Sequence, residues 1–195
     1  REEVSVNHFL ELLGESYAKT SSMLCLGMDP VLERMKIDVS RNLADEIVTF
    51  FVKLLEATKT LVSAAKPNVA FYESEGTQGW ASLEATVRYI RQRYPEMFII
   101  ADAKRGDIGN TSGLYARAFF EKMEVDAVTV APYMGEDSVK PFLAYPGKWV
   151  VLLALTSNKG AADFQYFTSA QGELLYEHVL KASGNWGTAD QMMYV

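Results

Sequence analysis

The sequence predicts an α/β protein in which parallel strands alternate with helices. Apolar residues recur at helical spacing in two long segments, at residues 40–63 and 80–90. Short apolar or β-branched runs of strand length lie before, between and after them, at residues 23–28, 64–72, 97–104, 127–133, 149–156 and 191–195. Such alternation is typical of parallel sheets whose crossover connections are helices.

The strands are expected to form a (β/α)8 barrel, the TIM barrel. Residues 149–155 are apolar on both faces, as a strand covered on both sides requires. An open doubly wound sheet is the alternative, but residues 26–30 (Leu-Gly-Met-Asp-Pro) hold no Gly-x-Gly-x-x-Gly after the first strand. Six candidate strands are present where a barrel has eight. We therefore expect residues 1–195 to form one barrel domain, to which the full-length protein adds two C-terminal βα units.

Three local features refine these elements. Cys25 lies in the first apolar run and is predicted to pack in the core. Ser40 precedes the first long helix, where a serine side chain can accept hydrogen bonds from free backbone N–H groups. Pro67 falls inside the second strand run and lacks the N–H that a central strand uses. We therefore expect a bulge in that strand.

Charge and composition exclude several classes of partner. A formal net charge of -6 provides no basic face for nucleic acid. The longest apolar run, residues 149–155, is far shorter than the roughly 20 residues that span a bilayer. The single cysteine suits a reducing compartment. We expect a cytoplasmic protein without a nucleic-acid or membrane partner.

An acid and a base lie side by side where the third strand ends. Side chains alternate along a strand, so Asp102 and Lys104 share one face. Barrel proteins place their active sites at this end of the strands. If only Asp102 and Lys104 are considered, a structural ion pair would explain them. However, Lys66 on the second strand and Asp107 just beyond the third add two charges, and each buried ion costs several kcal/mol of desolvation. Catalysis is the better reason to assemble all four.

The segment around this pair resembles a known family. Residues 101–111 (Ala-Asp-Ala-Lys-Arg-Gly-Asp-Ile-Gly-Asn-Thr) resemble the signature of orotidine 5'-phosphate decarboxylases. Residues 26–30, 66–73, 131–135 and 156–158 resemble further stretches of the family, particularly its bacterial branch. The resemblance covers essentially the whole chain. It implies a TIM barrel that converts orotidine 5'-phosphate to uridine 5'-phosphate in pyrimidine synthesis, without a metal or another cofactor.

The resemblance also implies a role for each matching residue. Lys104 resembles the lysine that protonates the product carbanion, Asp102 the carboxylate that faces the departing CO2, and Lys66 the second lysine of the charged array. Asp107 resembles the aspartate that enters the neighbouring subunit's site, which implies a homodimer with shared active sites. The implied substrate-binding positions are Asp29, Asn68, Ile108, Thr111, Pro132 and Ser157. The family's phosphate-binding glycine and arginine have no counterpart before Val195.

The chemistry of decarboxylation suits these residue types. Loss of CO2 from C6 of a pyrimidine leaves a carbanion in the ring plane, which a fixed cation such as the Lys104 ammonium can stabilise and then protonate. One charge pair at ~4 Å contributes ~4 kcal/mol at an effective dielectric constant near 20, a fraction of the ~8 to 23 kcal/mol that enzymes remove from barriers. Several preorganised contacts must therefore combine.

Three other functions are open on the sequence. A magnesium-dependent sugar-phosphate decarboxylase of the 3-keto-L-gulonate 6-phosphate type shares Asp-x-Lys-x-x-Asp, but it carries an acidic metal ligand where this chain has Lys66. A Schiff-base aldolase would use Lys104 as nucleophile, which calls for an apolar or cationic setting around that lysine. Asp102 places an acidic group beside it instead. A non-catalytic barrel that binds a phosphorylated ligand is the third.

Overall fold

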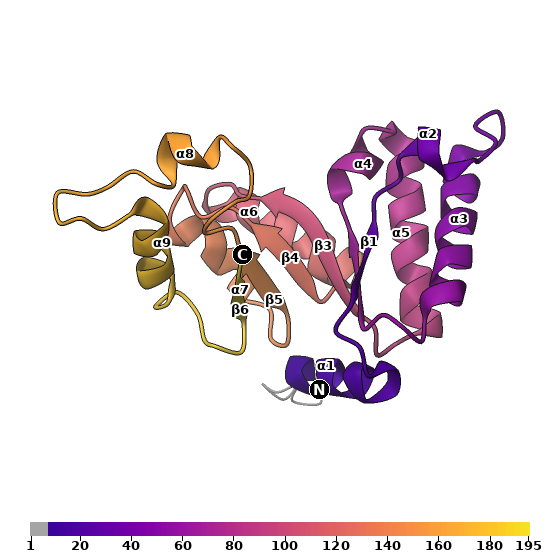
Figure 1. The fold of residues 1–195 in the computed structure, drawn as a ribbon, viewed down its shortest axis with the longest axis horizontal. Helices are drawn as coiled ribbons and strands as arrows, with labels where there is room; N and C mark the ends of the chain where they lie inside the picture. Colours follow the sequence, from indigo (N-terminus) through magenta and orange to yellow (C-terminus); the bar gives the residue numbers. More distant parts are fainter. Residues whose placement is uncertain (1–7) are drawn as a thin grey trace.

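The computed structural model describes residues 8–195 and confirms the α/β class. Its strands form one parallel sheet in the order β1-β2-β3-β4-β5-β6 (Figure 1). Their bounds are β1 (Cys25–Met28), β2 (Ala64–Pro67), β3 (Phe98–Arg105), β4 (Ala127–Val130), β5 (Trp149–Leu152) and β6 (Met192–Tyr194). Each strand pairs with the next one along the chain. This is the strand order of a barrel, whereas a doubly wound sheet reverses its order at a switch point.

Helices connect the strands, as the alternation predicts. Their bounds are α1 (His8–Thr20), α2 (Leu32–Met35), α3 (Leu43–Thr58), α4 (Val69–Glu73), α5 (Gly76–Arg93), α6 (Gly109–Arg117), the π-helix η1 (Ala118–Lys122), α7 (Glu136–Leu143), α8 (Ala161–Phe164) and α9 (Leu175–Ser183). Figure 1 shows α3 and α5 side by side next to β1, and α1 across the end at which the strands begin. No helix within residues 8–195 is both long and apolar enough to cross a membrane.

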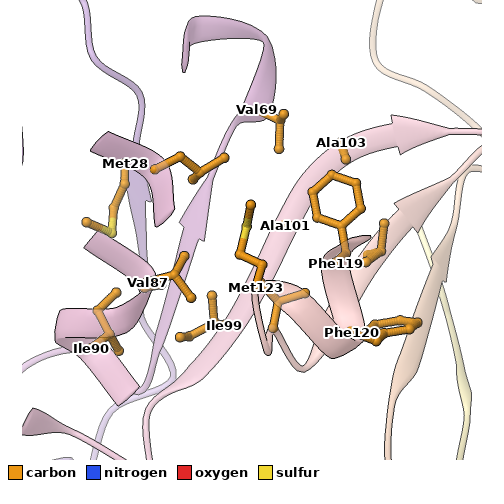
Figure 2. Close-up of a cluster of buried hydrophobic side chains, with 14 of the residues drawn as sticks. Met28, Val69, Val87, Ile90, Ile99, Ala101, Ala103, Phe119, Phe120 and Met123 are labelled. Carbon is orange, nitrogen blue, oxygen red and sulfur yellow. The ribbon is translucent and has the colours of Figure 1, made fainter. Parts of the chain in front are cut away.

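The two faces of the sheet have separate apolar clusters, which confirms the predicted alternation along β3. Ile99 and Ala101 belong to the larger cluster, between the sheet and the helices (Figure 2). Phe98 belongs to a smaller cluster on the opposite face, against which Leu13 of α1 packs. Asp102 lies an even number of residues from Phe98 and therefore shares the face turned away from the helices.

The first long helix is shorter than predicted, and Ser40 does not cap it. Helix α3 begins after Asn42, whose side chain accepts a hydrogen bond from the backbone N–H of Asp45 (3.2 Å). Ser40 instead donates both its hydroxyl and its backbone N–H to the Asp38 carboxylate (2.6 and 3.1 Å). The prediction of a Ser40 cap is wrong because a local turn uses that side chain.

Every predicted strand forms, but the second ends early. Its register with β1 is regular up to the pair of Met28 and Pro67, so the predicted bulge is absent from β2. Only Ala64 and Ala65 of β2 pair with β3, so no pairing with β3 needs the missing N–H of Pro67. Asn68 then begins α4 by accepting a hydrogen bond from the backbone N–H of Ala70 (3.3 Å).

The prediction of a buried Cys25 is also wrong. The residue is exposed at the start of β1. Among the described residues β1 pairs with β2 alone, so an apolar run there does not ensure burial.

Candidate active site

Lys66, Asp102 and Lys104 meet at the ends of β2 and β3, as the sequence predicts. The Lys104 Nζ lies 2.6 Å from Asp102 Oδ1, and the Lys66 Nζ lies 3.4 Å from Asp102 Oδ2. The carboxylate is largely buried, whereas the two lysine side chains are 37% and 54% exposed. One carboxylate thus holds two ammonium groups on side chains that stay partly exposed.

The surroundings of Asp102 favour its charged form. Burial alone would raise the pKa of this carboxyl. Hydrogen bonds from Lys104 and Thr129, together with the charges of Lys104 and Lys66, outweigh burial and hold the pKa below its ordinary value. Asp102 is therefore a carboxylate at neutral pH.

The fourth predicted charge, Asp107, lies outside this cluster. Its Oδ1 accepts a hydrogen bond from the backbone N–H of Ile108 (2.7 Å), and it forms no ion pair with any residue in the described part of the chain. Ile108 is 63% exposed, and Thr111 in the first turn of α6 is also exposed. Among the described residues, Asp107 thus makes no ion pair with the Lys66–Asp102–Lys104 cluster of its own chain.

The other predicted substrate-binding residues follow four strands at the same end of the sheet. Asp29 follows β1, Asn68 follows β2, Pro132 lies beyond β4 and the exposed Ser157 lies beyond β5. Parallel strands bring these positions to one edge, as a barrel active site requires.

The end of β1 is held in place by Tyr72, which the sequence analysis did not single out. The hydroxyl of this fully buried tyrosine donates to the carbonyl of Met28 (2.9 Å). Burial and the nearby Asp29 carboxylate both raise the pKa of Tyr72, so the hydroxyl stays protonated and remains a donor. The adjoining Asp29 keeps one buried carboxylate oxygen, Oδ1, without a hydrogen-bond partner among residues 8–195.

A cavity of about 290 Å³ lies beside the ends of β4 and β5, and Pro132, Thr156 and Gln165 are among its lining residues. Gln165 accepts a hydrogen bond from the backbone N–H of Thr156 (2.7 Å) and donates to its hydroxyl (2.9 Å). This pair of bonds fixes the segment that precedes Ser157. No sequence pattern indicated Gln165.

A larger hollow, of about 480 Å³, lies at the opposite end of the sheet. Leu13, Phe98, Ile100 and Met193 are among the residues that line it, and none of its lining residues is acidic or basic. This hollow therefore offers no charged group to a ligand, in contrast to the Asp102 cluster at the other end of the strands.

Comparisons with known proteins identify the family of the chain. The sequence profile of the orotidine 5'-phosphate decarboxylase / HUMPS family matches residues 22–188. The chain belongs to this family. The matched region includes every predicted site residue, from Asp29 to Ser157.

Members of the orotidine 5'-phosphate decarboxylase / HUMPS family resemble the chain closely. It is 55% identical over 183 residues to an orotidine 5'-phosphate decarboxylase of Bacteroides fragilis and 56% identical over 183 residues to one of Parabacteroides distasonis. Each alignment covers 94% of this chain, but only 66% and 65% of the two relatives. The chain thus spans slightly less than two thirds of their length.

Solved structures in the same family share the fold. The structure of Leishmania donovani OMP decarboxylase superimposes with a TM-score of 0.81 at 36% identity, over 95% of this chain and 69% of that one. The Leishmania donovani UMP synthase structure matches with the same score over 39% of its length. The family and the partial-barrel fold that the sequence predicts are confirmed.

Proposed function

We propose that the full-length protein converts orotidine 5'-phosphate to uridine 5'-phosphate, without a metal or another cofactor. The observation that carries this proposal is the Lys66–Asp102–Lys104 cluster, in which a buried carboxylate holds two half-exposed ammonium groups at the strand ends. Membership of the family and the names of the relatives support the same substrate. We further propose that the protein is a single barrel domain that works in the cytoplasm.

In the proposed reaction, the bond between C6 and the carboxylate carbon breaks and CO2 leaves. Its electron pair stays on C6, in the plane of the ring. The Lys104 ammonium stabilises this charge and transfers a proton to it, so that a C6–H bond forms and a neutral amine remains, which regains a proton from solvent. Because Asp102 Oδ1 accepts from the Lys104 Nζ at 2.6 Å, the proton donor is held in place before substrate arrives.

Lys66 and Asp102 complete the charge balance of the proposed site. Two ammonium groups and one carboxylate give the cluster a net charge of +1, which attracts an anionic substrate. Asp102 orients both cations and, on the proposed reading, lies beside the departing carboxylate.

We propose that Asp29, Asn68, Pro132 and Ser157 bind the nucleotide around this cluster. Asp29 would contact the ribose and Ser157 the edge of the pyrimidine. The unpartnered carboxylate oxygen of Asp29 and the position of all four residues at the same end of the sheet support this assignment.

We propose that the active enzyme is a homodimer to which Asp107, Ile108 and Thr111 contribute from the partner subunit. The lack of an ion pair between Asp107 and the charged cluster among the described residues supports this arrangement, as does the 63% exposure of Ile108. Mixing subunits that carry Asp107→Ala with subunits that carry Lys104→Ala should yield hybrids with one intact site. Activity that does not recover on mixing would contradict the shared site.

A magnesium-dependent sugar-phosphate decarboxylase is disfavoured by Lys66. Its ammonium lies 3.4 Å from Asp102 Oδ2 and so already supplies the cation at this carboxylate oxygen. Within residues 8–195, no group of three or more His, Cys, Asp or Glu side chains has the geometry of a metal site.

The test is to supply the full-length protein with orotidine 5'-phosphate in excess chelator and to follow the pyrimidine absorbance. Uridine 5'-phosphate should form at the rate seen without chelator. Absence of turnover, or turnover that stops with chelator and returns with magnesium, would overturn the proposal.

A further inference from the structure

The third strand carries an irregularity where its charged residues lie. Ala101 pairs with Val128 and Arg105 with Val130, so β3 advances four residues while β4 advances two. Residues 102–104 therefore form a bulge. At its end Lys104 has a φ of 47°, a left-handed conformation that is unfavourable for a residue with a side chain. The surrounding structure must hold this conformation in place.

A bulge removes backbone groups from the hydrogen bonds of the sheet, and here side chains replace the lost partners. The backbone N–H of Lys104 donates to Thr129 Oγ1 at 2.8 Å. The carbonyl of Ala103 accepts from Arg105 Nη1 at 2.9 Å. Arg105 is itself ion-paired with Glu73 of α4. The bulge is thus held by Thr129 on one side and Arg105 on the other.

Thr129 has a second contact that Arg105 lacks. Its hydroxyl donates to Asp102 Oδ1 at 3.0 Å, the same oxygen that accepts the Lys104 Nζ at 2.6 Å. A hydroxyl has one donor hydrogen and two acceptor lone pairs, so it can make both bonds at once. Thr129 is 5% exposed. One buried hydroxyl therefore joins the backbone of Lys104 to the carboxylate that holds the Lys104 side chain.

We propose that Thr129 is a positioning residue for proton transfer by Lys104. It fixes the lysine at both ends, through the backbone N–H and through Asp102, and so aims the ammonium at the reacting carbon. This inference rests on the proposed decarboxylase function. Thr129 acts through its two neighbours, so its loss should lower kcat and leave KM nearly unchanged.

The test compares three variants of the full-length protein with the parent. Thr129→Val keeps the shape of the side chain and removes the hydroxyl, whereas Thr129→Ser keeps the hydroxyl. Thr86→Val is the matched control, because Thr86 in α5 is fully buried and its hydroxyl has no partner among the described residues. We expect Thr129→Val to lower kcat by about 10- to 100-fold, the range for a hydrogen bond to a charged group. Thr129→Ser and Thr86→Val should stay close to the parent.

The outcomes separate the two proposals. An inactive parent would overturn the decarboxylase function, and the positioning role with it. If the parent is active, three results would overturn the positioning role alone. They are a parent-like kcat in Thr129→Val, an equal loss of kcat in Thr86→Val, and a kcat in Thr129→Ser as low as that in Thr129→Val. If Thr129→Val does not fold, Thr129→Ala replaces it, since alanine removes the hydroxyl without placing a methyl group against Asp102.

Discussion

Asp102 and Asp126 are buried to nearly the same degree, with side chains 11% and 10% exposed, and each lies beside two cations. Asp102 is near the end of β3, whereas Asp126 directly precedes β4, so the two clusters occupy opposite ends of the parallel sheet. Burial and charge alone do not distinguish them. The difference lies in what their cations do.

Around Asp126, the cations are committed to the backbone. Arg91 is ion-paired with Asp126 and donates to the carbonyls of Glu124 (2.9 Å) and Met97 (3.3 Å). Lys148 donates to the carbonyl of Val125 (2.7 Å), and Asp126 itself accepts from the N–H of Ile99 (2.8 Å). These bonds tie β3 and β4 to α5, so the cluster is structural.

Around Asp102, the cations keep free donors. Within residues 8–195, the ammonium groups of Lys66 and Lys104 hydrogen-bond to Asp102 alone. Both lysine side chains are also more exposed than those of Arg91 and Lys148, at 37% and 54% against 18% and 24%. A cation that makes no bond to the backbone at the open end of the strands can act on a ligand, whereas one bonded to backbone carbonyls stabilises the fold.

The largest expected effect is on turnover, and it distinguishes Lys104 from Lys148. Lys104→Ala should lower kcat by roughly 100- to 10,000-fold, because the proton donor is lost. Lys148→Ala should keep the parent kcat. Steady-state kinetics with orotidine 5'-phosphate, alongside circular dichroism to confirm folding, makes the comparison. Near-normal turnover in Lys104→Ala would remove that residue from the proposed role.

The next effect is on stability, and it should fall on the other cluster. Asp126→Ala removes a buried carboxylate and leaves two partly buried cations without their counter-charge, so it should lower the free energy of unfolding by about 3–5 kcal/mol. Asp102→Ala should cost less, because its two lysines are exposed enough for water to solvate them. Urea unfolding of both variants measures the difference. Equal losses would mean that the two clusters are equally structural.

The smallest effect is on the pH dependence of stability. The folded-state pKa of Asp102 lies below the ordinary 3.8, so the charged carboxylate contributes stability above that pH and loses it as the pH falls through the lower folded value. Asp102→Asn should therefore lose less stability than the parent below about pH 4. Urea unfolding at a series of pH values from 6 to 3 tests this. Identical acid profiles would show that Asp102 is not stabilised in its charged form.

Much of the site could be read from local patterns. Alternation along β3 predicted Asp102 and Lys104 side by side, and the structure brings them into contact although β3 bulges there. The end of the neighbouring strand places Lys66 beside them. Thr129 could have been noticed only as a polar residue in an otherwise apolar strand. Its contact with Lys104 joins residues 25 positions apart and depends on the register of two strands.

Two wrong predictions, a Ser40 cap and a buried Cys25, also concern contacts that a local pattern does not define. Ser40 and Cys25 each sit in a pattern that permits a cap or a core position, but neighbouring residues decide the outcome. The Asp38 carboxylate accepts the Ser40 hydroxyl, and among the described residues Cys25 lies on a strand that pairs on one side alone. The hydrophobic periodicity of a sequence does not show which of several nearby partners a side chain contacts.

By itself the sequence determined the α/β class, the six strands, the family and the charged residues at the strand ends, because all of these follow from local periodicity or from a contiguous motif. Only the tertiary structure decided that β3 bulges against β4, that Thr129 links Lys104 to Asp102, and that Asp107 lies outside their cluster. The reason is that register, bulges and side-chain partners between strands depend on packing residues that are far apart in the chain.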